Sequence, residues 1–382
     1  MYIYLIGFVI LFALVLKSYK TEEKKYNSIL GLIILYLALL VGLSDMLGGY
    51  DRYIYAEVFD STAISRSDGL PMAKNSAFIQ NPTELGFGMY NFLISFITGN
   101  RYIFILITTL IVYLSYYYHF TKLTKYPITA FFLFFCLFYF FTFTYLRQVM
   151  AASISWFAIP YAINRKPAKF FACVIIAAMF HNSALLFLSV YFVAKTRFSQ
   201  KQIIYSIIAI LLLGLTPLGA LLFSLIGGAV NEQKASGAIE HVGETRFAYM
   251  MEAFIFSLVI LKGYDKLAKD KVTTCMLNIS LLFIWVLLFF VRFTDAGRMS
   301  WYFIIGLCCT IAQILKATPR WNIMRVSMFG IFSYLYIRIL LAWGIFLYPY
   351  KTFLTNEVRE NDPTWEKYEY DHNYDNDKLY KL

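Results

Sequence analysis

The chain has 382 residues, of which 60% belong to the hydrophobic class AVILMFWYC and only 15% are charged. Soluble domains average roughly 45–50% apolar residues, glycine included, and about 25% charged residues. The mean hydropathy here is +0.61. One water-soluble core of this length cannot bury so much apolar surface, so the composition excludes an ordinary soluble enzyme and predicts an all-α integral membrane protein.

The net charge of +11 is unevenly distributed along the chain. From Tyr350 onward there are five Lys/Arg and eight Asp/Glu, a net charge of −3, while the preceding part carries +14. The basic residues gather in short loops between apolar segments, where they orient membrane spans. Since no basic stripe interleaved with aromatic residues lies on a polar face, we do not expect nucleic acid as a partner.

Ten segments are good or adequate candidates for crossing the hydrocarbon layer, for which about 20 apolar residues are typical and about 17 can suffice. Two further segments are ambiguous, because Leu85–Gly99 is short and contains glycines and Phe170–Ala194 is interrupted by His181-Asn182-Ser183. The ten predicted spans are Tyr2–Leu16, Ser28–Leu47, Tyr102–Tyr118, Pro127–Leu146, Val149–Ile163, Ile203–Ile226, Phe247–Leu261, Val272–Val291, Met299–Leu315 and Ile323–Tyr348.

Lys and Arg in short loops mark the cytoplasmic side. If all basic connections face inward, the chain makes ten crossings with two partial or re-entrant elements, and both termini lie outside. Twelve full crossings would place outside the five residues Lys122, Lys125, Arg165, Lys166 and Lys169, and would bring only Arg101 and Arg147 inside. The sequence favours ten. It predicts a polytopic domain over residues 1–348, with outer loops at 48–84 and 227–246, and a polar, weakly structured tail at 349–382.

Single cysteines at positions 147 and 166 test this topology. The ten-crossing arrangement predicts that an impermeant thiol reagent labels position 147 and not position 166 in intact cells. Equal labelling of the two positions would contradict it.

The predicted outer face gathers the polar residues that could carry chemistry. Non-helical backbone at membrane depth is tolerated only where protein covers it or where it lines a water-filled cavity. With His181 at the apex of a re-entrant segment, we therefore expect an outward-facing polar cavity. Its candidate residues are Tyr50, Asp51, Tyr55, Glu84, Arg147, Gln148, His181, Arg246, Arg292, Arg298 and Tyr302.

The arginines have two interpretations. Each lies near a span end, where arginine is common as a snorkelling anchor. The four candidate arginines nevertheless fall on the side that the positive-inside rule disfavours, and a polyanionic headgroup such as pyrophosphate would explain them, because the guanidinium fork suits phosphate. These four are Arg147, Arg246, Arg292 and Arg298.

Three titratable residues are candidates for a general base. His181 is either a satisfied core histidine or a base or donor within the membrane. Asp51 follows Gly48-Gly49-Tyr50 and belongs either to an interfacial aromatic belt or to a sugar-binding surface. Glu84 is either an N-terminal helix acid or a carboxylate at the cavity rim. No Walker A, GxGxxG, HExxH or Cys/His metal spacing is present, and neither predicted outer loop contains a DxD pair, so we expect no metal or other cofactor.

The order of several motifs resembles the EpsG family of Wzy-type polysaccharide polymerases. The resemblance covers roughly residues 48–191, and Arg298 with Tyr302-Phe303 resembles a later motif of that family. The matching motifs are Gly49-Tyr50-Asp51 with Tyr55, Glu84-Leu85-Gly86-Phe87, Leu146-Arg147-Gln148-Val149-Met150-Ala151, Arg165-Lys166 with Lys169-Phe170, and Phe180-His181-Asn182-Ser183-Ala184.

The resemblance implies a membrane glycosyltransferase of the GT-C type in the bacterial cytoplasmic membrane. Such enzymes join oligosaccharide repeat units carried on undecaprenyl pyrophosphate at the outer membrane face, without a metal. Arg147 and Arg298, with Arg246 and Arg292, would bind pyrophosphate, and Gln148 would orient an oxygen. His181, Asp51 or Glu84 would be the base. Partners would be lipid-linked glycans as donor and acceptor, membrane lipid, and, where chain length is controlled, a regulator. A ligase with the same donor, a flippase or transporter, and a membrane O-acyltransferase are the alternatives.

Overall fold

The structure is a computed structural model and describes residues 2–219, 245–293, 296–359, 364–365 and 377–380. It is 76% helical, and the described residues form no strand. Seven helical segments in the described part are long and apolar enough to span a membrane. They contain α1 (Tyr2–Lys17), α2 (Asn27–Gly42), α6 (Arg101–Leu123), α15 (Phe247–Gly263), α16 (Lys271–Phe289), α18 (Ile304–Lys316) and α19 (Ile323–Ala342). The predicted all-α membrane fold is confirmed.

The other three predicted spans are shorter or broken helices. Residues Pro127–Leu146 form α7 (Pro127–Phe138) followed by the 3₁₀ helix η4 (Tyr139–Phe143). The next span is divided into α8 (Leu146–Trp156) and α9 (Ile159–Ile163), with a proline in the first turn of α9. In the segment from Ile203, α12 (Gln200–Gly214) is described, whereas the end of that span and most of the outer loop 227–246 lie outside the described residues.

Both ambiguous segments are short helices. The first contains α5 (Leu85–Ile94). The second contains α10 (Pro167–Ala178), η5 (Asn182–Leu188) and α11 (Ser189–Val193), so its helix is interrupted around His181, as the sequence predicted.

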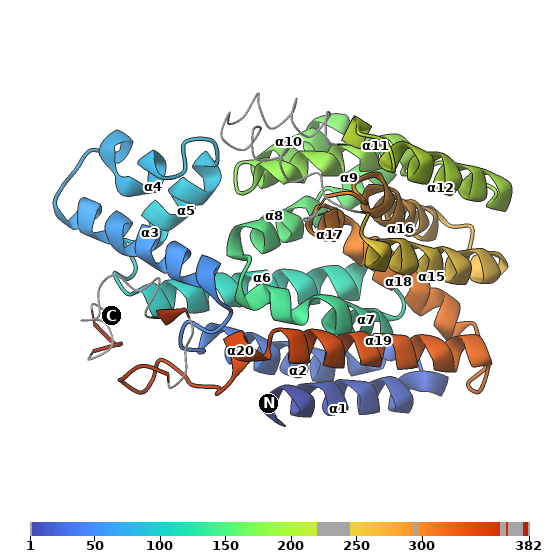
Figure 1. Cartoon of the computed structure of the whole chain (residues 1–382), viewed down its shortest axis with the longest axis horizontal. Helices are drawn as coiled ribbons and strands as arrows, with labels where there is room; N and C mark the ends of the chain where they lie inside the picture. The colour runs from blue at the N-terminus through green and yellow to red at the C-terminus, as the bar shows by residue number, and fades with distance from the viewer. Residues whose placement is uncertain (1, 220–244, 294–295, 360–363, 366–376, 381–382) are drawn as a thin grey trace. The chain divides into compact units, whose positions relative to one another are not determined.

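The chain forms two compact units. The first comprises residues 1–154, 175–182 and 326–382, and the second comprises 155–174 and 183–325. In the first unit α1, α2, α6, α7 and most of α19 run side by side, and α3 (Tyr50–Ser67), α4 (Ser76–Ile79) and α5 lie at one end of them (Figure 1). The short α20 (Gly344–Leu347) follows α19. In the second unit α16 contacts α9, α11, α12, α15 and α18.

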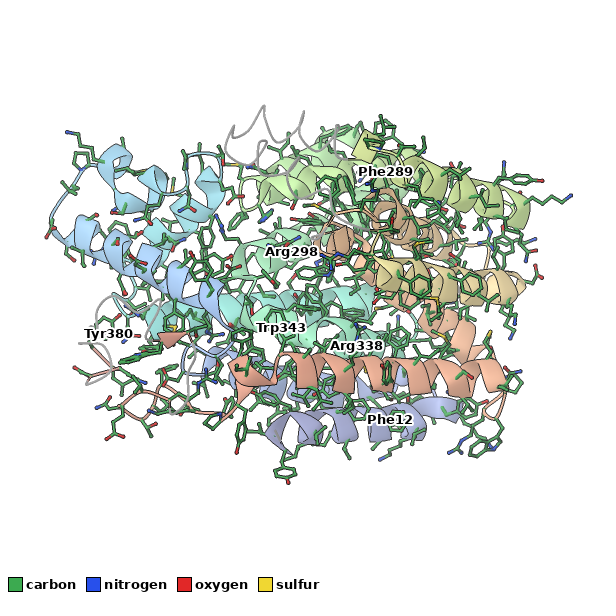
Figure 2. All side chains as sticks on the ribbon, viewed as in Figure 1. Phe12, Phe289, Arg298, Arg338, Trp343 and Tyr380 are labelled. Carbon is green, nitrogen blue, oxygen red and sulfur yellow. The ribbon has the colours of Figure 1, made fainter. Side chains whose placement is uncertain are left out.

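Aromatic side chains make up much of the core of the first unit. Phe12 of α1, labelled in Figure 2, packs against Phe132 of α7, and the ring centroids are 5.4 Å apart. The Tyr336 ring of α19 stacks on Phe8 at 4.9 Å, and its hydroxyl donates to the Tyr4 carbonyl at 2.8 Å. Such ring pairs stabilise packing beyond the area that they bury, so they fix α1, α7 and α19 against one another without charges.

A buried carboxylate joins two basic connections of the first unit. Glu23 accepts hydrogen bonds from the backbone N–H groups of Ile128 and Thr129, at 2.8 and 3.0 Å, in the first turn of α7. A carboxylate at a helix N-terminus satisfies orphan donors and favours the helix dipole. The bond brings the connection Lys17–Lys25 next to Lys122–Lys125, which is the arrangement required if both face the cytoplasm.

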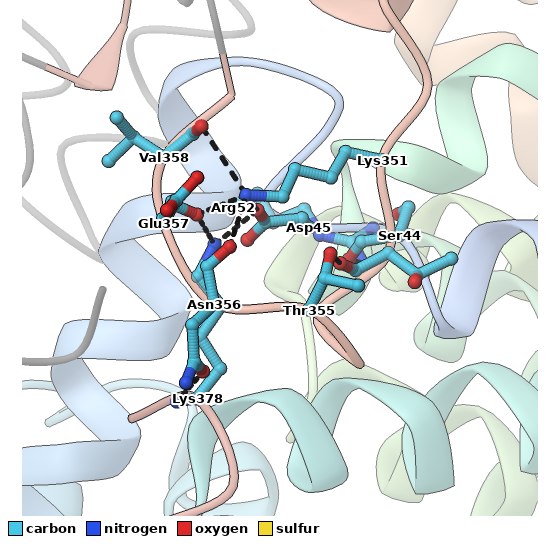
Figure 3. A network of polar contacts seen from close by, with 10 residues as sticks. Ser44, Asp45, Arg52, Lys351, Thr355, Asn356, Glu357, Val358 and Lys378 are labelled. Atoms are coloured by element: carbon cyan, nitrogen blue, oxygen red, sulfur yellow. Dashed lines mark hydrogen bonds and ion pairs between the residues drawn. The ribbon is translucent and has the colours of Figure 1, made fainter. Parts of the chain in front are cut away.

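Residues far apart in the sequence meet near the start of α6 (Figure 3). The Lys378 ammonium donates to Asp45 and to the Glu357 carbonyl, and it is almost completely buried. Asn100, the N-cap of α6, donates to the Lys378 carbonyl at 2.9 Å. The described C-terminal residues 377–380 are therefore attached to the first unit by specific bonds.

The Asp60–Arg101 pair lies beside this attachment. The Arg101 Nε donates to Asp60 Oδ2 at 2.6 Å, and the two side chains are 3% and 7% exposed. The Tyr380 hydroxyl donates to the other Asp60 oxygen at 2.8 Å. Burial raises the pKa of the Tyr380 phenol above its usual range, so the group stays a donor and completes the pair.

The variant Asp60→Asn is expected to destabilise the protein by about 3–5 kcal/mol, because it leaves the buried Arg101 guanidinium without its carboxylate. Tyr380→Phe removes a single hydrogen bond to that carboxylate and is expected to cost about 1.5–3 kcal/mol. Thermal unfolding of the purified proteins in the same detergent measures both. Equal midpoints for wild type and Asp60→Asn would contradict the prediction.

Candidate functional site

A glycine turn places α3 against the segment that precedes α8. Gly48 and Gly49 have φ angles of +120° and +90°, which glycine adopts without strain. A Cβ on Gly48 would lie 2.6 Å from the Phe143 carbonyl oxygen. The Thr144 hydroxyl donates to the Gly48 carbonyl at 2.5 Å. The two glycines therefore form the turn between α2 and α3 and allow α3 to begin close to the chain that leads into Arg147.

Arg52 connects the same segments from inside the protein. Its Nη2 donates to the carbonyls of Val41 and Ser44 at 2.9 and 3.2 Å, and its Nη1 donates to the Phe143 carbonyl at 3.2 Å. Burial lowers the pKa of Arg52 to about 10, so the guanidinium stays charged at neutral pH. A cation suits the carbonyl end of α2, where the helix dipole is negative. The sequence alone did not predict this role of Arg52.

Arg147, at the start of α8, lies between aromatic rings and a carboxylate. Its Nη1 donates to Glu84 Oε2 at 2.6 Å. Its Cζ lies 5.3 Å from the Tyr55 ring centroid and 5.8 Å from that of Phe87, within the range of cation–π attraction. The Asn81 Oδ1 lies 3.4 Å from the same Nη1. The Glu84 side chain is 5% exposed, whereas that of Arg147 is 29% exposed. The guanidinium is thus fixed by protein contacts and still partly accessible.

The same carboxylate contacts the segment that contains His181. Glu84 Oε1 accepts the backbone N–H of Asn182 at 3.3 Å. The Asn182 Nδ2 donates to the Thr83 hydroxyl at 3.3 Å. Asp51, in the first turn of α3, is near enough to interact electrostatically with Arg147. The first unit therefore brings together Asp51, Tyr55, Glu84, Arg147 and the segment around His181.

Three candidate residues of the first unit differ in exposure. Tyr50 is 46% exposed and Gln148 only 2%. His181 is half-buried, between the end of α10 and the start of η5.

The second unit contains the remaining candidates. Tyr302 is fully buried in η7 (Trp301–Phe303), and its hydroxyl shares a 2.8 Å hydrogen bond with Ser183. Arg246 is exposed at the N-cap of α15, and its backbone N–H donates to the Val291 carbonyl at 3.0 Å. Arg292 donates to the Leu215 carbonyl at 3.4 Å. Arg298 lies half-buried in α17 (Ala296–Ser300) (Figure 2).

Several other arginines donate to main-chain carbonyls near helix ends. Arg165 donates to the Tyr191 carbonyl at 2.6 Å, and Arg325 to the Leu315 carbonyl at 2.7 Å. Such bonds satisfy the orphan acceptors of a helix C-terminus. Arg147 differs from them, because its guanidinium lies between two aromatic rings and pairs with a buried carboxylate. Within the described parts of the chain, no group of three or more His, Cys, Asp or Glu is placed to hold a metal ion.

The fold and this site define a multi-pass membrane protein with a charged pair beside a helix break. A sequence model of the EpsG family matches residues 27–352. The chain therefore belongs to the EpsG family, which is associated with polysaccharide biosynthesis at membranes. Comparisons with curated proteins and with solved structures gave no match.

Proposed function

We propose that the protein is a polysaccharide polymerase of the GT-C type at the outer face of the bacterial cytoplasmic membrane. It would join oligosaccharide repeat units carried on undecaprenyl pyrophosphate. The observation that carries the proposal is the partly exposed Arg147 guanidinium, fixed by Glu84 between Tyr55 and Phe87 and next to the His181 segment. Family membership supports the polysaccharide substrate.

The reaction needs a cation where negative charge develops. In the transfer, the bond between the donor sugar and its lipid pyrophosphate breaks, and a bond forms between that sugar carbon and the acceptor hydroxyl oxygen. The pyrophosphate leaves as an anion, and arginine donors in a site of low dielectric stabilise it. We assign this role to Arg147 and, in the second unit, to Arg298, with Arg246 and Arg292 as further phosphate contacts.

The acceptor hydroxyl must lose a proton to a base. His181 and Asp51 are the preferred candidates, because Glu84 already accepts hydrogen bonds on both oxygens. Gln148 would orient a phosphate or sugar oxygen. The exposed Tyr50 ring offers a surface for a sugar face, whereas Tyr55 and Tyr302 are buried and would act by positioning. Membrane lipid surrounds the site, and a chain-length regulator is a partner compatible with this function.

The glycans that accumulate in a deletion strain test the function. Single lipid-linked repeat units at the outer face, without polymer, are the expected result. Polymer that is made but not attached would instead indicate a ligase, and units retained inside the cell would indicate a flippase.

The variant Arg147→Lys is expected to polymerise about 10²–10³-fold more slowly, which is the usual effect of removing one charge-stabilising donor. The reason is that an ammonium has no planar fork and stacks poorly on Tyr55 and Phe87. The readout is polymer formed from lipid-linked repeats by the purified protein. Arg197→Lys is the matched control, since Arg197 also stacks on a tyrosine, Tyr264, but donates to main-chain carbonyls. Wild-type rates in Arg147→Lys would exclude the phosphate role.

The variant His181→Gln is expected to abolish polymer while single lipid-linked repeats persist, if His181 accepts the proton. Asp51→Asn is the companion variant, with the same expectation if Asp51 is the base. Polymer length on gels of extracted glycans measures both. Normal polymer in His181→Gln would exclude that histidine as the base.

A further inference from the structure

The turn that contains His181 is bonded to the first turn of α5. The backbone N–H groups of Gly86 and Phe87 both donate to the Met179 carbonyl, at 2.9 and 3.1 Å. Met179 directly follows the last residue of α10. Orphan donors at the N-terminus of one helix thus meet a carbonyl beyond the C-terminus of another, an arrangement that the two helix dipoles favour.

This contact depends on the absence of a side chain at position 86. A Cβ on Gly86 would lie 2.7 Å from the Met179 Cβ and 3.1 Å from its carbonyl carbon and oxygen. Contacts shorter than 3.0 Å force a shift, and two of these atoms are main chain. Since Met179 lies two residues before His181, any side chain at position 86 displaces the backbone that leads into the histidine.

A third bond fixes the other side of the same turn. Glu84 Oε1 accepts the Asn182 N–H at 3.3 Å while Oε2 accepts the Arg147 Nη1 at 2.6 Å. One buried carboxylate therefore sets the position of the His181 segment relative to the Arg147 guanidinium. Because both oxygens are engaged, Glu84 is poorly suited to take a proton from an acceptor hydroxyl.

We infer that the α5 N-terminal turn, residues Glu84–Phe87, positions His181, and that Gly86 and Glu84 are positioning residues of the reaction. The expected change in reaction rate rests on the proposed function, whereas the expected displacement of the His181 segment does not. A displaced histidine lowers the rate of the chemical step and leaves the affinity for the lipid-linked donor unchanged, since the Arg147–Glu84 pair remains in place.

The variant Gly86→Ala tests this in the purified full-length protein, reconstituted in vesicles of bacterial phospholipid. Misplacement by 1 Å can cost about 10² in rate, so kcat is expected to fall by about that order, with KM for the lipid-linked donor unchanged. Gly330→Ala is the matched control, because a Cβ at that position would contact nothing within 4 Å. Gly86 and Gly330 both lie in helices, where alanine is favoured over glycine. Hydrogen exchange of the peptide spanning residues 179–183 is expected to be faster in Gly86→Ala than in wild type, and unchanged in Gly330→Ala.

A second substitution separates this contact from general destabilisation. Met179→Gly removes the Cβ closest to position 86, so the double variant Gly86→Ala/Met179→Gly is expected to regain kcat relative to Gly86→Ala. Glu84→Gln is expected to lower kcat without altering the shape of the pH–rate profile. If the fall in rate at low pH disappeared in Glu84→Gln, Glu84 would be the base, and its positioning role would be overturned.

Two results would overturn the inference. One is that Gly86→Ala matches Gly330→Ala in both kcat and exchange. The other is that Gly86→Ala raises KM as it lowers kcat and the double variant regains nothing. If the wild-type protein forms no polymer from lipid-linked repeats, the proposed function fails, and the exchange comparison still decides whether the α5 turn positions the His181 segment.

Discussion

The ion pair between Arg147 and Glu84 is the interaction on which the proposed site depends. A nearly buried carboxylate is costly unless it is paired and hydrogen-bonded, and Glu84 meets that need with Arg147 on one oxygen and the Asn182 N–H on the other. The pair therefore joins the starts of α5 and α8 to the turn after α10. Tyr55 adds α3 through its ring. Four segments that are distant in sequence are thereby held in one arrangement.

The sequence predicted the fold well, because membrane spans are encoded locally. A span needs about 20 consecutive apolar residues, and seven predicted spans correspond to helices of that length. The interruption at His181 was also evident, since polar residues divide an apolar segment. The division between α8 and α9 was missed, because Val149–Ile163 is one continuous apolar segment, although a new helix with Pro160 in its first turn begins inside it.

The site was less accessible to prediction, because its contacts are long-range. Glu84 and Asn182 lie 98 positions apart, and no periodicity links them. Arg147 and Glu84 were each named as candidates, but their pairing was not predicted. Arg52 lies in the same aromatic segment as Asp51 and Tyr55, yet nothing local distinguishes an arginine that binds carbonyls from one that pairs with a carboxylate. Asn81 and Asn182 act through geometry that only the folded chain defines.

Exposure separates three arginines that the predicted topology places on the side disfavoured by the positive-inside rule. Arg52 and Arg101 are each 3% exposed, the first bonded to main-chain carbonyls and the second to Asp60. Their charges are satisfied within the protein, so they need no ligand to explain their position. Arg147 has an internal partner as well, but its side chain remains 29% exposed. Among these three, it is the guanidinium that an anionic headgroup could reach without breaking the contacts that position it.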